Sequence, residues 1–164
     1  MFAVLISNSV EDTVSIGSRV AKRLKRGDVV ALIGELGSGK TVFTKGIAKG
    51  LGVKDSRYVN SPSFVIIKEY KGKIPLYHFD LYRLEKPHLL DSLNYEEYFY
   101  GNGATVIEWA DKIRELLPKR YLEVKLSVIG ENKRRIKLTS HCEEGAKRLT
   151  KQSKSRLLRT SCAQ

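Results

Sequence analysis

The sequence has 164 residues, a hydrophobic fraction of 41% and a formal net charge of +12. This length predicts one main domain that buries a core large enough to fold without disulfides. The two cysteines, Cys142 and Cys162, form no C-x-x-C pair, which argues against a disulfide framework or a zinc site. The apolar segment at residues 2–6 is too short for a signal peptide or a membrane span, so we expect a cytoplasmic protein without membrane contact.

The positive charge is concentrated near the C-terminus. Residues 132–164 hold ten basic and two acidic residues, a net charge of +8, whereas residues 1–131 carry +4. We therefore predict a domain over residues 1–140 and a basic tail, helical or frayed, over residues 141–164. Such a tail attracts polyanions such as tRNA without selecting one, and an ordinary solvated surface explains it equally well.

In the first third of the chain, apolar patterns predict strands and helices in alternation. Residues 2–6 favour a strand, and Ser9 followed by Asp12 is typical of a helix start; Gly27 would end that helix. The run DVVALI at residues 28–33 is continuous and rich in β-branched side chains, as in a parallel strand buried on both faces. A helix is expected over residues 41–51.

The rest of the chain predicts two hairpins around a mixed middle section. Residues 64–70 and 74–80 favour the first hairpin, and residues 121–129 and 134–139 favour the second. Between them we expect a broken helical stretch at 81–100, a short buried strand at 104–107 and a short helix at 111–117 that Pro118 stops.

The segment GELGSGKT at residues 34–41 follows a predicted buried strand and opens a predicted helix. It fits the phosphate-binding pattern G-x-x-x-x-G-K-[ST] through Gly34, Gly39, Lys40 and Thr41. Glycines let backbone N–H groups close around phosphate oxygens, Lys40 would reach the outer phosphates, and the Thr41 hydroxyl would bind Mg²⁺. The predicted fold is therefore α/β, a P-loop NTPase-type sheet flanked by helices with antiparallel hairpin additions.

A P-loop needs a second acid to complete the magnesium site, usually at the end of a neighbouring strand. Asp80 and Glu108 both end predicted strands, and ligands of open α/β sheets bind at that edge. The physical pattern does not choose between these two acids.

Four motifs occur in a distinctive order: GELGSGKT (34–41), SPSF (61–64), YHFDLYRL (77–84) and IEW (107–109). Through these motifs, the chain resembles the TsaE family, also called YjeE, of bacterial P-loop ATPases. The resemblance covers about residues 1–140. The resemblance implies an ATP hydrolase that is weak alone and uses ATP and Mg²⁺. It also implies TsaB-like and TsaD-like partners and a role in the N6-threonylcarbamoyladenosine (t6A) modification of tRNA.

The same resemblance implies roles for individual residues. Lys40 and Asp80 would be catalytic, with Asp80 near the γ-phosphate, and Thr41 and Glu108 would hold the metal ion. The loop of Ser61, Pro62 and Ser63 would sense the nucleotide or a partner. The implied nucleotide-binding residues are Glu35, Leu36, Gly37, Ser38, Gly39, Lys40, Thr41, Val42, Trp109 and Arg135.

Several positions keep two interpretations. His78 fits either a general base or a packed structural histidine. The aromatic residues Tyr95, Tyr98, Phe99 and Tyr100 fit either a core cluster or a binding face, which would stack bases or dock a protein. Arg83 fits either transition-state stabilisation or a salt bridge with Glu85 or Glu108. Two other functions also fit a P-loop: a small kinase, although no arginine-rich lid is evident at residues 85–120, and a nucleic-acid-binding NTPase that uses the basic tail.

Overall fold

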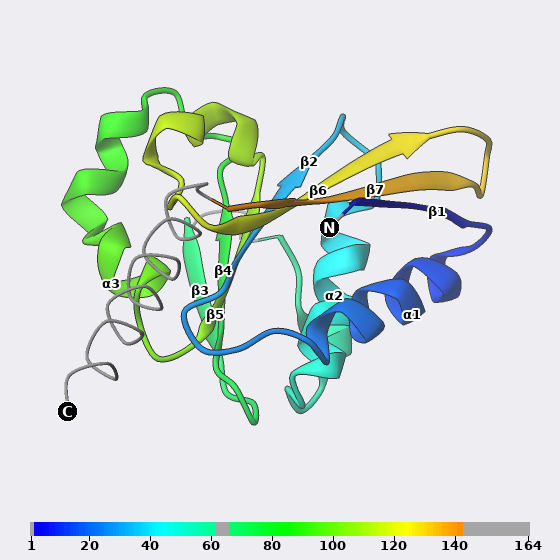
Figure 1. Ribbon diagram of the computed structural model, residues 1–164, viewed down its shortest axis with the longest axis horizontal. Helices are drawn as coiled ribbons and strands as arrows, with labels where there is room; N and C mark the ends of the chain where they lie inside the picture. Colours follow the sequence, from blue (N-terminus) through cyan, green and yellow to red (C-terminus); the bar gives the residue numbers. More distant parts are fainter. Residues whose placement is uncertain (1, 62–65, 143–164) are drawn as a thin grey trace, which may run out of the picture.

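The structure is a computed structural model that describes residues 2–61 and 66–142. The described chain forms one seven-stranded sheet in the order β1-β7-β6-β2-β5-β4-β3, with helical segments packed on both faces (Figure 1). The strands are β1 (Phe2–Ser7), β2 (Val29–Ile33), β3 (Ile67–Tyr70), β4 (Leu76–Asp80), β5 (Ala104–Glu108), β6 (Tyr121–Val128) and β7 (Arg134–His141).

The four central strands β6, β2, β5 and β4 run parallel, and antiparallel strands complete both edges of the sheet. Strands β2 and β5 are buried at every position, because helical segments cover both of their faces. The two predicted hairpins are present as β3–β4 and β6–β7. The predicted α/β fold class with antiparallel additions is confirmed.

The helical segments divide between the two faces of the sheet. On one face, α1 (Val10–Ala21) and α2 (Lys40–Gly50) pack together, and the short η1 (Ser56–Tyr58) follows α2. On the other face lie η2 (Pro87–Leu93), α3 (Tyr95–Phe99) and η3 (Ala110–Leu116) (Figure 1). Each face therefore has its own apolar cluster, and the two clusters hold the central strands between them.

Helix α1 begins where the sequence predicts and ends earlier. The Ser9 hydroxyl accepts the N–H of Asp12 at 3.0 Å, and the Asp12 carboxylate accepts the N–H of Asn8 at 3.0 Å. These reciprocal bonds satisfy donors that a helix N-terminus leaves open. The helix ends at Ala21, six residues before Gly27, because tighter turn bonds such as Leu24 N–H to Ala21 C=O replace the helical pattern.

Helices α1 and α2 cross at glycines. A Cβ placed on Gly17 would lie 2.5 Å from the carbonyl oxygen of Phe43, and one on Gly46 would lie 2.3 Å from that of Val14. Both distances are too short for real contacts, so the two backbones approach as closely as they do only because neither residue has a side chain. This crossing fixes the position of α2, whose first turn continues the glycine loop.

The middle of the chain departs from the predicted elements in detail. The helix expected at 111–117 is the 3₁₀ segment η3, with a kink at Ile113. The stretch at 81–100 is divided between η2 and α3, and Phe99 of α3 is buried against Phe79, whereas Tyr100 is 70% exposed. The start of the strand predicted at 64–70, and most of the predicted basic tail, lie outside the described residues.

Candidate nucleotide site

A cavity of about 330 Å³ lies at the carboxyl ends of β2, β4 and β5, where the glycine loop leads into α2. Larger hollows occur elsewhere on the surface, but this cavity brings together a lysine, two carboxylates and the loop backbone. Chemistry rather than volume therefore selects it as the candidate site. Its lining residues are Leu36, Gly37, Gly39, Lys40, Thr41, Val42, Ser61, Asp80, Tyr82, Glu108 and Trp109.

The backbone of the glycine loop has the geometry of an anion cradle. Gly37 and Gly39 have φ values of +74° and +99°, which side-chain-bearing residues rarely adopt. Gly39 caps the N-terminus of α2, where free N–H groups and the helix dipole favour negative charge. The hydroxyl of Ser38 is buried and has no hydrogen-bond partner among the described residues. A bound phosphate would fit this loop.

Lys40, the first residue of α2, is buried with its ammonium folded back onto the loop. Its Nζ donates to the carbonyl oxygens of Gly34 (2.7 Å) and Glu35 (2.9 Å) and lies 3.6 Å from the centroid of a Trp109 ring. Burial lowers the pKa of Lys40, and the carboxylates around it, Glu108 first, act in the opposite direction. Because its direct partners are neutral, phosphate oxygens can replace them with a gain in charge pairing.

Glu108, at the end of β5, is 2% exposed and accepts three side-chain hydrogen bonds. Thr41 donates to Oε2 at 2.9 Å, while Thr44 at 3.0 Å and the Nε2 of His78 at 2.9 Å contact Oε1. If Glu108 is ionised it only accepts, which assigns a proton to the Nε2 of His78. His78 is fully buried, as a packed histidine would be, but its Nδ1 has no hydrogen-bond partner among the described residues. Hydroxyl and carboxylate oxygens are ligands that Mg²⁺ prefers, so the pair of Thr41 and Glu108 fits that ion.

Asp80, at the end of β4, is 8% exposed and lies opposite Glu108 in the β4–β5 register. Its carboxylate accepts hydrogen bonds from the Ser61 hydroxyl and from the N–H of Tyr82. Burial raises the pKa of Asp80, and this effect exceeds the opposing influence of the Tyr82 N–H and of Lys40. The two acids that the sequence pattern left undecided therefore share one cavity with different partners.

Two predicted arginines do not line this cavity. Arg83 is exposed and lines a separate hollow beside Glu85, and Arg135 is exposed on β7. Side chains alternate along β7, so Arg134 faces the helix side, where its guanidinium donates to the carbonyl oxygen of Gly37 at 3.4 Å. The nucleotide contact of Arg135 stays a prediction, and Arg134 is the arginine that contacts the loop.

Sequence reasoning missed three residues of this site. Thr44 lies one turn after Lys40, a spacing that would have placed it beside Thr41 on the same helix side. Tyr82 stacks on Trp109 with ring centroids 5.2 Å apart, and the HFDLYR motif contained it. No feature of the sequence distinguished Arg134 from its neighbour Arg135. The roles implied for Pro62 and Ser63 lie outside the described residues.

The glycine loop connects the buried parallel strand β2 to helix α2, and acidic residues end the strands β5 and β4 beside it. This arrangement defines a P-loop nucleotide-binding protein. Comparison with known proteins places the chain within that class. The family profile "Threonylcarbamoyl adenosine biosynthesis protein TsaE" matches residues 7–136, and the chain belongs to the TsaE family.

Individual relatives agree with this assignment. The tRNA threonylcarbamoyladenosine biosynthesis protein TsaE of Bacillus subtilis is 47% identical over 131 residues, 79% of this chain and 80% of that protein. The protein of the same name in Treponema pallidum is 37% identical, covering 80% of this chain and 96% of its own length. The crystal structure of Bacillus subtilis YdiB superposes with a TM-score of 0.71 at 34% identity, over 95% of this chain and 96% of that one.

The helices offer no membrane span. None of those in the described ranges combines the length and the apolar character that crossing a bilayer requires.

Proposed function

We propose that this protein binds ATP with Mg²⁺ in the loop cavity and hydrolyses it to ADP and phosphate in support of t6A modification of tRNA. The observation that carries the proposal is the convergence of Lys40, Asp80 and Glu108 on one cavity beside the glycine loop. The names of the relatives supply the pathway, since they are tRNA threonylcarbamoyladenosine biosynthesis proteins.

Phosphate binding falls to the loop and to Lys40. The loop N–H groups and the start of α2 would surround the phosphate oxygens, and the ammonium would leave the carbonyl oxygens of Gly34 and Glu35 to reach them. Thr41 and Glu108 would hold Mg²⁺, which when bound neutralises phosphate charge. Thr44 and His78 keep the Glu108 carboxylate in place for that role.

Asp80 would position the attacking water and accept its proton. A carboxylate whose pKa is raised by burial is a better proton acceptor near neutral pH than an ordinary aspartate. Ser61 and the Tyr82 N–H fix the orientation of the carboxylate, so a change at Ser61 would be felt directly at Asp80. This contact would let a change at the nucleotide reach Ser61 through Asp80.

The partners in the proposal are TsaB-like and TsaD-like proteins, with tRNA reached through their complex or through the basic tail. Hydrolysis would be weak in the isolated chain and would support turnover of the complex. The fit of the chain to the TsaE family profile over residues 7–136 supports this assembly.

Two substitutions test the chemistry. Lys40→Ala should lose nucleotide binding, measured by titration calorimetry with ATP and Mg²⁺, because the loop loses its cation. Asp80→Ala should still bind ATP but hydrolyse it about a hundredfold more slowly, the loss typical of a removed general base. Lys49→Ala, an exposed lysine of the same helix, is the matched control and should retain both properties. Wild-type hydrolysis in the Asp80 variant would contradict the proposed mechanism.

A further inference from the structure

The outer part of the sheet has one face that no described helix covers. Figure 1 shows α1 packed below strands β1, β7 and β6, and no helical segment of the described chain above their outer portion. The register places three residues from each strand side by side on the uncovered side. We name this surface the open face; its members are Phe2, Val4 and Ile6 of β1, Arg135, Lys137 and Thr139 of β7, and Glu123, Lys125 and Ser127 of β6.

Strand β1 gives the open face an apolar stripe. Phe2, Val4 and Ile6 are 65%, 48% and 45% exposed, although they alternate with Ala3 and Leu5, which pack against the core beneath. A strand that is apolar on both faces is typically covered on both faces. Strand β1 is an edge strand, and the described residues cover only one of its faces. Three large apolar side chains in one exposed row indicate a surface that meets another molecule.

Strands β7 and β6 border this stripe with positive charge. Lys125, Arg135 and Lys137 are exposed, and within the described residues none of them forms an ion pair. Lys137 instead lies with its Nζ 5.2 Å from the centroid of the Phe2 ring. The single acid of the open face, Glu123, is already engaged by Arg114 at 3.4 Å and by His141. The face therefore presents uncompensated cations beside an apolar row.

We propose that the open face docks a partner protein of the tRNA-modifying assembly through a surface that carries an apolar patch edged by carboxylates. The inference rests on the proposed function for the existence of that assembly. Charge complementarity selects an acidic partner. Bases stack on aromatic rings, and two of the three apolar side chains of the stripe, Val4 and Ile6, are aliphatic, which favours protein over RNA.

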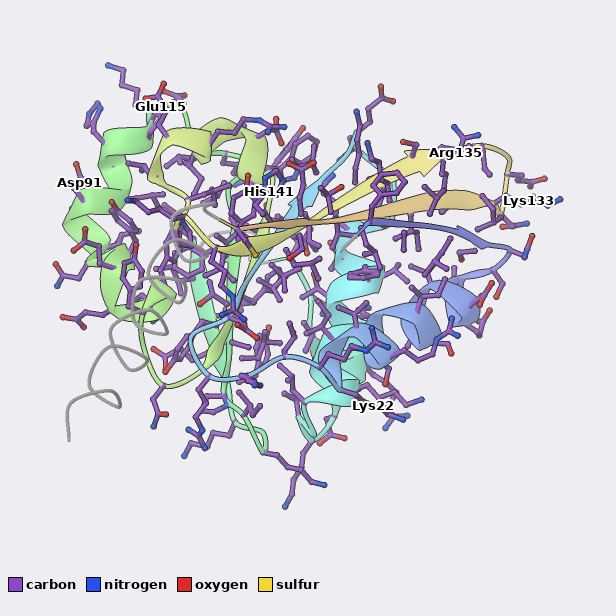
Figure 2. All side chains as sticks on the ribbon, viewed as in Figure 1. Lys22, Asp91, Glu115, Lys133, Arg135 and His141 are labelled. Atoms are coloured by element: carbon purple, nitrogen blue, oxygen red, sulfur yellow. The ribbon has the colours of Figure 1, made fainter. Side chains whose placement is uncertain are left out.

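The position of the open face also links docking to the nucleotide loop. Strand β7 carries Arg135 on the open side and Arg134 on the other, and Arg134 donates to the carbonyl oxygen of Gly37. Figure 2 shows Arg135 and Lys133 on the β6–β7 hairpin, with Lys22 well below them in the view. A partner seated on β7 would thus hold the strand that contacts the phosphate cradle.

The test uses two double variants of the full chain and two matched controls. Val4→Ser with Ile6→Ser removes two of the three apolar side chains of the stripe, and Lys125→Glu with Lys137→Glu reverses the charge of two of the three border cations. The controls are Val10→Ser, which alters a 57%-exposed valine on α1, and Lys22→Glu, which alters an exposed lysine elsewhere. Circular dichroism and ATPase rate establish that each variant is folded, since none of these residues lines the nucleotide cavity.

Affinity is measured by biolayer interferometry against the purified TsaB-like and TsaD-like proteins of the same genome, with ATP and Mg²⁺, at low and high salt. Each double variant should bind about tenfold more weakly than wild type, the loss expected when central contacts of an interface are removed. The charge-reversed variant should also lose much of the salt dependence. Both controls should bind like the wild-type protein.

Several outcomes would overturn the proposal. If wild type binds and both double variants bind equally well, the docking surface is elsewhere while the proposed function stands. If wild type does not bind in any nucleotide state, both the partner assignment and this inference fall. Binding of a tRNA transcript that only charge reversal abolishes would assign the face to RNA. A wild-type dimer in sedimentation analysis that the serine variant converts to monomer would assign it to a second copy.

Discussion

Replacing Thr44 by valine tests whether the buried cluster around Glu108 is held by hydrogen bonds to a charge. The hydroxyl lies 3.0 Å from Glu108 Oε1 and 3.0 Å from the Lys40 carbonyl oxygen, and its single proton serves these two acceptors. Valine has nearly the same shape, so the change removes the hydrogen bond without leaving a cavity. A hydrogen bond to a buried charged group contributes about 1.5–3 kcal/mol to the free energy of unfolding.

That loss corresponds to a fall in Tm of roughly 3–12 °C for a domain of this size. Urea unfolding followed by the fluorescence of Trp109, the single tryptophan, measures the free energy directly. Because Glu108 would then be held by Thr41 and His78 alone, the Mg²⁺ concentration needed for half-maximal ATPase should also rise. Thr44→Ser, which keeps the hydroxyl, should preserve the metal dependence. A valine variant with unchanged stability and unchanged metal dependence would refute the role given to this cluster.

Three further predictions concern other parts of the fold. Because burial raises the pKa of Asp80, the ATPase rate should fall on acidification at a pH above the ordinary aspartate range. Burial disfavours the ionised form of Asp80, so the Asp80→Asn variant should be more stable than wild type at pH 7. That advantage should vanish as the pH falls below the ordinary pKa of aspartate. Equal urea midpoints for variant and wild type at pH 7 and at that lower pH would contradict this. Gly34→Ala would bring a Cβ within 2.5 Å of the Leu126 carbonyl oxygen, so calorimetry should show lost nucleotide binding and urea unfolding a destabilisation of about 1–3 kcal/mol. Ser9→Ala should cost about 1 kcal/mol by removing the helix cap, measured against exposed Ser15→Ala, and a loss no larger than in that control would exclude a capping role.

The sequence predicted those parts of the site whose residues belong to a local motif or end a predicted strand. The glycine loop lies between a buried strand and a helix, and its function needs that order, so Lys40 and Thr41 could be named in advance. Asp80 and Glu108 end parallel strands, and the shared edge of a parallel sheet brings such ends together. Ser9 and Asp12 likewise announced the start of α1.

The features that the sequence did not predict depend on how distant parts of the chain pair in the folded structure. Arg134 and Arg135 are adjacent, so a shift of one residue in the strand register would exchange which of them faces the loop. Only the pairing of β7 with β6 and β1 fixes that register. The contact of His78 with Glu108 joins side chains 30 residues apart across neighbouring strands, and no spacing announces it. The 3₁₀ segment η3 begins directly after Trp109, whose backbone is in the left-handed region, and no sequence pattern predicted either feature.

The glycine crossing of α1 and α2 has a consequence at a distance. The amides that would grip the triphosphate stand at the first turn of α2, while Gly46 touches α1 nearly two turns further along. A methyl group at position 17 or 46 would push α2 outward as a rigid rod and carry those amides with it. In the proposed function, nucleotide affinity would therefore depend on two residues that do not line the cavity, and alanine at either position should weaken nucleotide binding.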